Sequence, residues 1–161
     1  MDGRFLLTLY GLTKEHIELL RYFKWITLLL LFVLVICMYN QKKAIIHAGL
    51  SAITCWLINA IIHMYIYIPR PFVRYGIEPL IKHSANASFP SDHAAVSFAI
   101  AVSLMFYNKK IGIIAVLTAC TICLIRITAG LHYPIDTVIG AGIGTISAIL
   151  LWILLRGYKN E

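Results

Sequence analysis

The sequence predicts an all-α integral membrane protein: a bundle of about five transmembrane helices that follows an N-terminal interfacial amphipathic segment. Hydrophobic residues make up 60% of the 161-residue chain, and the mean hydropathy is +0.83. A soluble globular domain is only about 45–50% apolar. The apolar residues gather into five long runs, and short basic connections separate several of them. A chain of this length is expected to form a single domain, residues 1–161.

The first 21 residues differ from the rest of the chain. Apolar residues such as Leu6 and Leu9 alternate there with charged residues such as Arg4 and Lys14. This segment is too polar to span a membrane and amphipathic enough to lie in its interface. We expect a pair of membrane-surface helices over 1–21 and a transmembrane bundle over 22–155; a partner-binding helix is the alternative for the first segment.

Five apolar runs follow, each expected to be a helix. A bilayer core needs about 20 helical residues, and backbone groups in lipid must pair within their own segment. The third run is short, so we extend its entry into the Ser91-Asp92 turn. In chain order the runs are Tyr22–Tyr39, Ala44–Ile68, His93–Tyr107, Ile111–Thr128 and Pro134–Leu155.

Basic residues indicate the orientation of the bundle. The connections at 41–43 and 108–110 carry lysines and no acids, and the tail carries Arg156 and Lys159. We expect these three regions to face the cytoplasm. The third and fourth runs cross the membrane twice, so the connections 69–92 and 129–133 should share the extracytoplasmic side. Four basic residues that this orientation places outside count against it: Arg4, Lys14, Arg21 and Lys24.

The formal charge of +7 does not indicate a nucleic-acid partner, because no run of Lys and Arg is long enough for a binding arm. The expected partner is the lipid bilayer. The oligomeric state does not follow from the sequence.

Ionisable and hydroxyl side chains gather in and beside the two connections on the predicted outer side. Ionisable groups at membrane depth are costly and usually form a site. Guanidinium groups bind phosphate oxygens. Ser91 is a natural N-cap for the third helix, and the first N–H groups of that helix form an anion site. A phosphate-handling centre is therefore expected from Arg70, Ser91, His93, Arg126, His132 and Asp136.

Two histidines at one phosphate site favour different catalytic roles for the two rings. One histidine can attack phosphorus while the other protonates the leaving oxygen. Asp136 lies four residues after His132 and could hold the far nitrogen of that ring. A purely structural hydrogen bond at a helix entrance is the alternative for this pair.

Three motifs in order resemble the signature of the type 2 phosphatidic acid phosphatase superfamily, which is Lys-x6-Arg-Pro, Pro-Ser-Gly-His and Ser-Arg-x5-His-x3-Asp. The matching segments are Arg70-Pro71, Pro90-Ser91-x-His93 and Arg126-x5-His132-x3-Asp136. Within this superfamily, Ala87–His93 and Leu131–Asp136 resemble undecaprenyl-diphosphate phosphatases of the bacitracin-resistance type.

The resemblance implies a role for each residue. His132 would be the nucleophile that forms a phosphohistidine, Asp136 would orient it, and His93 would protonate the leaving lipid phosphate. The phosphoryl oxygens would be held by Arg70, Arg126, Ser91 and backbone N–H groups near Asp92. The cations would stabilise the negative charge of the phosphoryl group, as a metal ion could, so neither a metal nor another cofactor is expected.

The same resemblance implies a substrate and a location. A polyprenyl diphosphate, foremost undecaprenyl diphosphate, would be cleaved to the monophosphate and inorganic phosphate, which recycles the lipid carrier of cell-wall synthesis. The protein would be multi-pass in a bacterial plasma membrane. The alternatives are a phosphatase for phosphatidylglycerophosphate, phosphatidate or another lipid phosphate, and, from a different class, a non-catalytic binder or transporter of lipid phosphates.

Three positions depart from the family pattern. His63 stands where the family has lysine, so either His63 or a loop cation such as Lys82 could take that role. Asp92 replaces the glycine of the second motif, where a carboxylate must point away from phosphate, cap the helix or pair with arginine. Ile125 replaces the serine before Arg126.

Other polar residues and glycines in the runs have structural interpretations. We expect His16 and His47 to be solvated or interfacial and His83 to lie in a loop. Asn59 is expected to form a hydrogen bond between helices. Close helix packing is expected at Gly140, Gly142 and Gly144.

Overall fold

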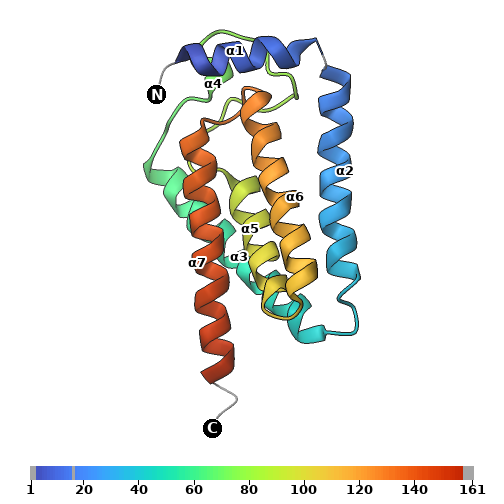
Figure 1. Cartoon of the computed structure of the whole chain (residues 1–161). Helices are drawn as coiled ribbons and strands as arrows, with labels where there is room; N and C mark the ends of the chain where they lie inside the picture. The colour runs from blue at the N-terminus through green and yellow to red at the C-terminus, as the bar shows by residue number, and fades with distance from the viewer. Residues whose placement is uncertain (1–2, 16, 158–161) are drawn as a thin grey trace.

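The computed structural model describes residues 3–15 and 17–157, and within these ranges every regular element is a helix. The helices form a bundle with one further helix lying across its end (Figure 1). In chain order they are α1 (Gly3–Lys14), α2 (Ile17–Ile36), α3 (Lys42–Tyr65), α4 (Pro71–Arg74), α5 (Asp92–Met105), α6 (Lys109–Thr128) and α7 (Pro134–Gly157).

The predicted all-α membrane fold is confirmed. By length and hydropathy α3, α6 and α7 can each cross a bilayer, while α5 and the apolar part of α2, Tyr22–Ile36, are shorter apolar helices. Each of the five predicted runs contains one helix, although α2 ends at Ile36 and α3 at Tyr65, three residues before the predicted ends Tyr39 and Ile68. The helix of the first run, α2, begins at Ile17, earlier than the expected Tyr22. Helix α5 begins directly after Ser91, as the extension of the third run predicted.

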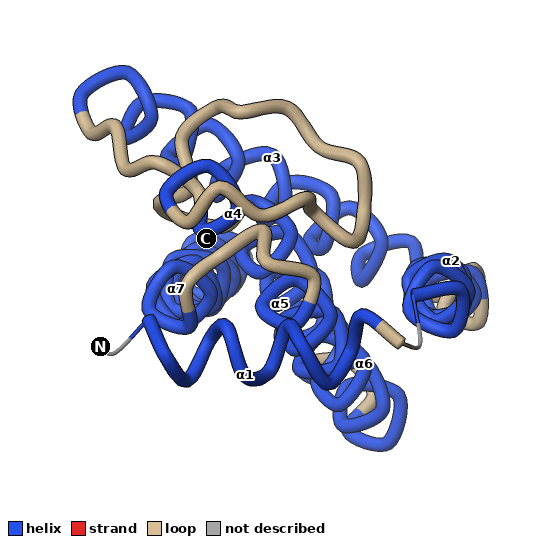
Figure 2. The backbone as a smooth tube through the Cα atoms, turned by 90° about the horizontal axis from the view of Figure 1, so that it is seen from above, coloured by secondary structure: helices blue, strands red, loops and turns tan. Residues whose placement is uncertain are grey.

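Helix α5 lies inside the bundle, packed against α3, α6 and α7 (Figures 1 and 2). It has only 14 residues, or about 21 Å of rise, less than a bilayer core. The helices around it meet most of the lipid in its place. Small buried residues make this close packing possible: Ala94, Ala95, Ser97, Ala99, Ala101 and Ser103.

Glycines on α7 complete this contact. A Cβ on Gly140 would lie 2.5 Å from the carbonyl oxygen of Ser91, and a Cβ on Gly144 would collide with the carbonyl group of Ala95. These two glycines therefore allow close packing, as predicted. Gly142 has open space around it, so the prediction is wrong for Gly142, which points away from α5.

Helix α1 lies across the end of the bundle (Figure 1). The hydroxyl of Tyr10 donates to the carbonyl oxygen of Glu78 at 2.7 Å, and the hydroxyl of Thr13 donates to that of Thr128 at 3.2 Å. The expected pair of surface helices over 1–21 is wrong: α1 is one helix, and the following residues from Ile17 already belong to α2.

The connections 66–91 and 129–133 meet beside α1, at what we call the site end of the bundle (Figure 2). Backbone N–H groups of Phe72 and Leu80 donate to the carbonyl oxygens of Gly130 and Ala129, at 3.1 and 3.3 Å. The prediction that these connections share one side is confirmed. Gly130 has a φ of +73°, a conformation that favours glycine in this tight turn.

His47 lies at the opposite end, which we call the far end, and it is fully buried. Its Nε2 donates to the carbonyl oxygen of Ala148 at 2.9 Å, and the rings of Phe106, Tyr107 and Trp152 surround it. The expectation that His47 is solvated is wrong, because α3 turns this residue toward α5 and α7. The expectations for His16 and Lys159 fall outside the described residues.

Candidate active site

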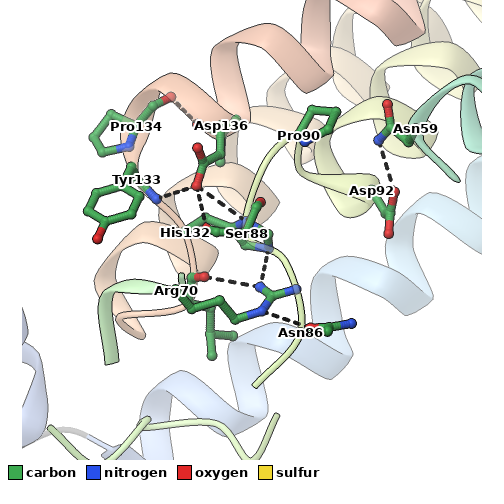
Figure 3. Close-up of polar contacts among 12 residues, drawn as sticks. Asn59, Arg70, Asn86, Ser88, Pro90, Asp92, His132, Tyr133, Pro134 and Asp136 are labelled. Atoms are coloured by element: carbon green, nitrogen blue, oxygen red, sulfur yellow. Dashed lines mark hydrogen bonds and ion pairs between the residues drawn. The ribbon is translucent and has the colours of Figure 1, made fainter. Parts of the chain in front are cut away.

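His132 lies in the turn between α6 and α7 and is 2% exposed. Its Nε2 is 2.9 Å from Nη1 of Arg70, and its Nδ1 is 2.9 Å from the carbonyl oxygen of Ser88 (Figure 3). A guanidinium group can only donate, so Nε2 accepts and carries no proton. The ring proton therefore sits on Nδ1, and the lone pair of Nε2 faces the cations.

Asp136, in the first turn of α7, is fully buried beside this ring. Its Oδ2 accepts hydrogen bonds from the hydroxyl of Ser88 at 2.5 Å and from the backbone N–H of Tyr133 at 2.8 Å. The distance from Oδ2 to Nδ1 of His132 is 3.8 Å. The carboxylate thus faces the far nitrogen, as predicted, but the shorter contact of that nitrogen is with the Ser88 carbonyl oxygen.

Sequence reasoning missed Ser88, which connects the nucleophile candidate to its carboxylate. Its carbonyl oxygen binds His132 while its hydroxyl binds Asp136, and its N–H donates to the carbonyl oxygen of Ile68 at 2.8 Å. The only signal in the sequence was its position two residues before Pro90, inside the second motif.

The surroundings of His132 keep its ring neutral near pH 7. Burial lowers the pKa of His132 below its usual value, because a charged ring loses hydration there. The positive charges of Arg70 and Arg126 lower this pKa further, while Asp136 opposes them. The lone pair of Nε2 is thus available for nucleophilic attack.

Arg70 is 4% exposed and is held from several sides. Besides His132, its Nη1 donates to the carbonyl oxygen of Leu131 at 3.0 Å, and its Nε donates to Oδ1 of Asn86 at 3.0 Å. Burial lowers the pKa of Arg70, and the charges of Asp92 and Asp136 raise it; a guanidinium stays protonated in this balance. Asn86, in the loop before α5, was also missed by sequence reasoning.

Arg126 lies in the last turn of α6 and is 3% exposed. Its backbone carbonyl oxygen accepts from the N–H groups of Leu131 and His132 at 3.1 and 3.3 Å, which holds the turn. Among the described residues, its Nε and Nη2 have no hydrogen-bond partner. Buried donors without partners are costly, so this guanidinium is set to bind an acceptor such as a phosphate oxygen.

Ser91 and His93 lie at the start of α5. The Ser91 N–H donates to the carbonyl oxygen of Asp136 at 3.1 Å, which joins the start of α5 to that of α7. Ser91 occupies the predicted N-cap position, but its hydroxyl makes no capping bond and is buried without a described partner. His93 is partly buried and lines a small pocket together with Arg126.

Three other candidates lie outside this cluster. Oδ1 of Asp92 accepts from Nδ2 of Asn59 at 2.9 Å and is turned away from His132 (Figure 3); this confirms the predicted interhelical bond of Asn59. Nε2 of His63 donates to the carbonyl oxygen of Pro90 at 3.0 Å, and Lys82 is exposed in the loop. Neither His63 nor Lys82 has a side-chain contact with the His132 cluster in the described part of the chain.

His83 is a further loop residue close to the cations. Burial lowers the pKa of His83 to about 4, and the positive charges of Arg70 and Arg126 contribute to this shift. The ring is therefore neutral at pH 7. The expectation that His83 lies in a loop is confirmed, but its proximity to the site was not predicted.

The fold and this cluster define a class of protein: a membrane-embedded helical bundle with a centre for nucleophilic chemistry on an anionic group. A neutral histidine, a buried carboxylate and two buried guanidinium groups meet at one end of the bundle. Over the described ranges, no three His, Cys, Asp or Glu side chains gather as a metal-ligand set.

Residues 44–159 match the PAP2 superfamily. This match covers most of the chain, and the chain belongs to that superfamily, as its three motifs predicted.

Curated relatives carry lipid-phosphatase names. The chain is 39% identical over 97 residues to "Undecaprenyl-diphosphatase BcrC" of Bacillus subtilis (strain 168), which is 60% of this chain and 50% of the relative. It is 32% identical to "Putative undecaprenyl-diphosphatase YbjG" of Escherichia coli (strain K12), over 68% of this chain and 56% of the relative. A "Lipid A 4'-phosphatase" of Bacteroides thetaiotaomicron is 43% identical over 45% of this chain and 33% of the relative. The chain thus matches about half the length of the first two relatives.

Solved structures share the fold. The structure of Aquifex aeolicus LpxE superposes with a TM-score of 0.75 at 27% identity, covering 91% of this chain and 93% of that one. A transmembrane PAP2-type phosphatidylglycerolphosphate phosphatase from Bacillus subtilis superposes with a TM-score of 0.62 at 20% identity, covering 99% and 88%. The second likeness concerns the fold alone.

Proposed function

We propose that this protein is a polyprenyl-diphosphate phosphatase that cleaves undecaprenyl diphosphate to undecaprenyl phosphate and inorganic phosphate. The observation that carries the proposal is His132, whose unprotonated Nε2 faces a guanidinium while its Nδ1 side faces a buried carboxylate. The names of the BcrC and YbjG relatives support this substrate. The protein would act in a bacterial plasma membrane, with the site end facing the extracytoplasmic side, away from the lysines at 41–43 and 108–110.

In the first step, Nε2 of His132 attacks the terminal phosphorus, and the bond from phosphorus to the bridging oxygen breaks. The negative charge of the bound diphosphate favours protonation of His93, and the protonated ring gives its proton to the leaving lipid phosphate. Arg70 exchanges its bond to Nε2 for a phosphoryl oxygen. The unpartnered N–H groups of Arg126 and the hydroxyl of Ser91 hold the other phosphoryl oxygens.

In the second step, water attacks the phosphohistidine, and His93, now neutral, takes a proton from that water. The bond from nitrogen to phosphorus breaks, inorganic phosphate leaves, and His132 returns to its starting tautomer. Asp136 stabilises the positive charge that the phosphorylated ring carries between the two steps. Its hydrogen bonds to Ser88 and to the Tyr133 N–H keep it in place.

Phosphate release from undecaprenyl diphosphate tests the proposal directly. The purified protein in detergent with excess EDTA should release phosphate, and His132→Ala should not, while both unfold at similar temperatures. Rapid quenching with labelled terminal phosphate should trap an acid-labile, base-stable phosphoenzyme only when His132 is present. Release that needs a divalent metal, or undiminished release by His132→Ala, would contradict the mechanism.

A phosphatase for lipid monophosphates is the second candidate, and the 43% identity to a lipid A 4'-phosphatase favours it. Phosphatidate, phosphatidylglycerophosphate and lipid A compared with undecaprenyl diphosphate in one rate panel would rank the two candidates by kcat/KM. A non-catalytic binder would instead retain all these lipids and release no phosphate from any of them.

A further inference from the structure

Two adjoining hollows between α2, α5 and α6 form what we call the groove. Its wider part has a volume of about 240 Å³, and its walls include Leu28, Leu31 and Val96. Its narrow inner part, of about 10 Å³, is lined by Lys24, His93 and Arg126, among others. Leu28, His93 and Ile122 line both parts, so the two parts adjoin, the wider one mainly apolar and the narrow one cationic. The narrow part is smaller than a phosphate group, so the flexible Lys24 side chain has to swing outward to admit one.

The groove lies where the bundle is least closed. α2 stands at the edge of the bundle and packs mainly against α6, while α5 is enclosed by α3, α6 and α7 (Figures 1 and 2). A lipid tail among Leu28, Leu31 and Val96 would therefore bring its headgroup to His93 and Arg126.

The inner part of the groove holds one cation, Lys24, that the proposed mechanism does not use. Arg126 is 3% exposed, and its unpartnered Nε and Nη2 mark a place for an anion. Lys24 adds a second cation from α2, where its Nζ lies 4.8 Å from the centre of the Trp25 ring. The one carboxylate in the groove wall, Asp92, is bonded to Asn59.

We propose that Lys24 binds the second, non-reacting phosphate of a diphosphate lipid and so favours diphosphates over monophosphates. This inference rests on the proposed function. With the terminal phosphate at His132 and its leaving oxygen at His93, the second phosphate lies on the groove side of His93. Lys24 is the lysine that lines this part of the groove. Its ammonium group has three donors on a flexible stem, which suits a leaving phosphate whose charge increases as the bond breaks.

Non-hydrolysable analogues separate this role from turnover. Farnesyl methylenebisphosphonate carries both phosphorus groups, and farnesyl phosphonate carries one. In Lys24→Met the Ki of the bisphosphonate should rise about 10- to 100-fold, the value of a lost charge-assisted contact. The Ki of the monophosphonate should change less than about threefold, and Lys24→Arg should recover most of the bisphosphonate affinity.

Lys14→Met is the matched control, because it removes the same charge from the exposed end of α1 at the same end of the bundle; both Ki values should stay at wild type. Equal losses for both analogues in Lys24→Met, or unchanged bisphosphonate binding, would overturn the role of Lys24. Phosphate release from undecaprenyl diphosphate is measured in parallel with wild type. Its absence would refute the proposed function, whereas the dissociation constants of the two analogues, measured by titration calorimetry, still report whether Lys24 contacts the second phosphorus group.

Discussion

The two ends of the bundle each bury a histidine, and only one of them forms a candidate reactive site. His132 is 2% exposed and His47 is 0% exposed. Both ring nitrogens of His132 have partners, and a carboxylate and guanidinium groups surround it. His47 makes one bond, to Ala148, and lies among aromatic rings. Burial of a histidine therefore says little about reactivity; the charges buried with it matter more.

The cations of the two ends differ in the same way. At the site end, Arg70 and Arg126 are buried. At the far end, Lys43 and Arg156 are exposed and line a cavity of about 340 Å³ beside Trp152, as interfacial anchors in membrane proteins do. Desolvation strengthens an electrostatic interaction, so the buried cations can hold a phosphoryl group, and the exposed ones can meet headgroups and water.

The largest expected effect separates the two histidines. His132→Ala should lower kcat/KM by about 10³-fold or more, because the nucleophile is lost. His47→Gln should keep kcat/KM within about threefold of wild type while lowering stability by about 1–3 kcal/mol through its buried hydrogen bond. Kinetics and thermal unfolding of both variants measure the contrast. A catalytic loss in His47→Gln equal to that of His132→Ala would break the comparison.

A second, smaller effect concerns the carboxylate beside His132. Asp136→Asn keeps an acceptor for the Tyr133 N–H and loses the negative charge, so kcat/KM should fall about 10²- to 10³-fold. Glu78→Gln is the control, since it removes one exposed negative charge from the loop at the same end and should leave kcat/KM unchanged. Equal rates for Asp136→Asn and wild type would limit Asp136 to a structural role.

Packing at the site end gives a third test. Gly140→Ala places a Cβ against the Ser91 carbonyl oxygen and should lower stability by about 1–3 kcal/mol. Gly142→Ala, on the same helix in open space, should raise stability by up to about 1 kcal/mol through helix propensity. Thermal unfolding in detergent distinguishes them, and a stabilised Gly140→Ala would show that α5 and α7 are more loosely packed than described.

The smallest expected effect is on the pH dependence of stability. The pKa of His132 is lowered in the folded protein, so below the usual histidine pKa of about 6.5 the unfolded chain binds a proton that the folded one does not. Stability should therefore be full above pH 6.5 and fall as the pH drops toward the lowered pKa. The melting temperature of His132→Asn should decline less between pH 7 and pH 5; parallel curves would contradict a lowered pKa for His132.

Residues of the connection 66–91 show which features could not be predicted from the sequence. Ser88, Asn86 and His83 lie in a loop without periodicity, so no pattern tells which of their polar groups face Arg70 or His132. The burial of His47 was missed for a related reason: its neighbours Phe106 and Trp152 come from distant helices. Contacts between distant segments depend on how helices rotate about their axes, and apolar composition says little about that rotation in a membrane.

By itself the sequence determined the membrane-spanning helices and the shared side of the two polar connections. Apolar run length and the need to satisfy backbone hydrogen bonds in lipid leave few other solutions. Only the tertiary structure decided that the Ser88 carbonyl group stands between His132 and Asp136, that Asp92 turns to Asn59, and that Lys24 meets Arg126 in one groove. Those arrangements follow from the packing of α5 against α3, α6 and α7 and of α2 against α6, which brings donors and acceptors from distant segments close together.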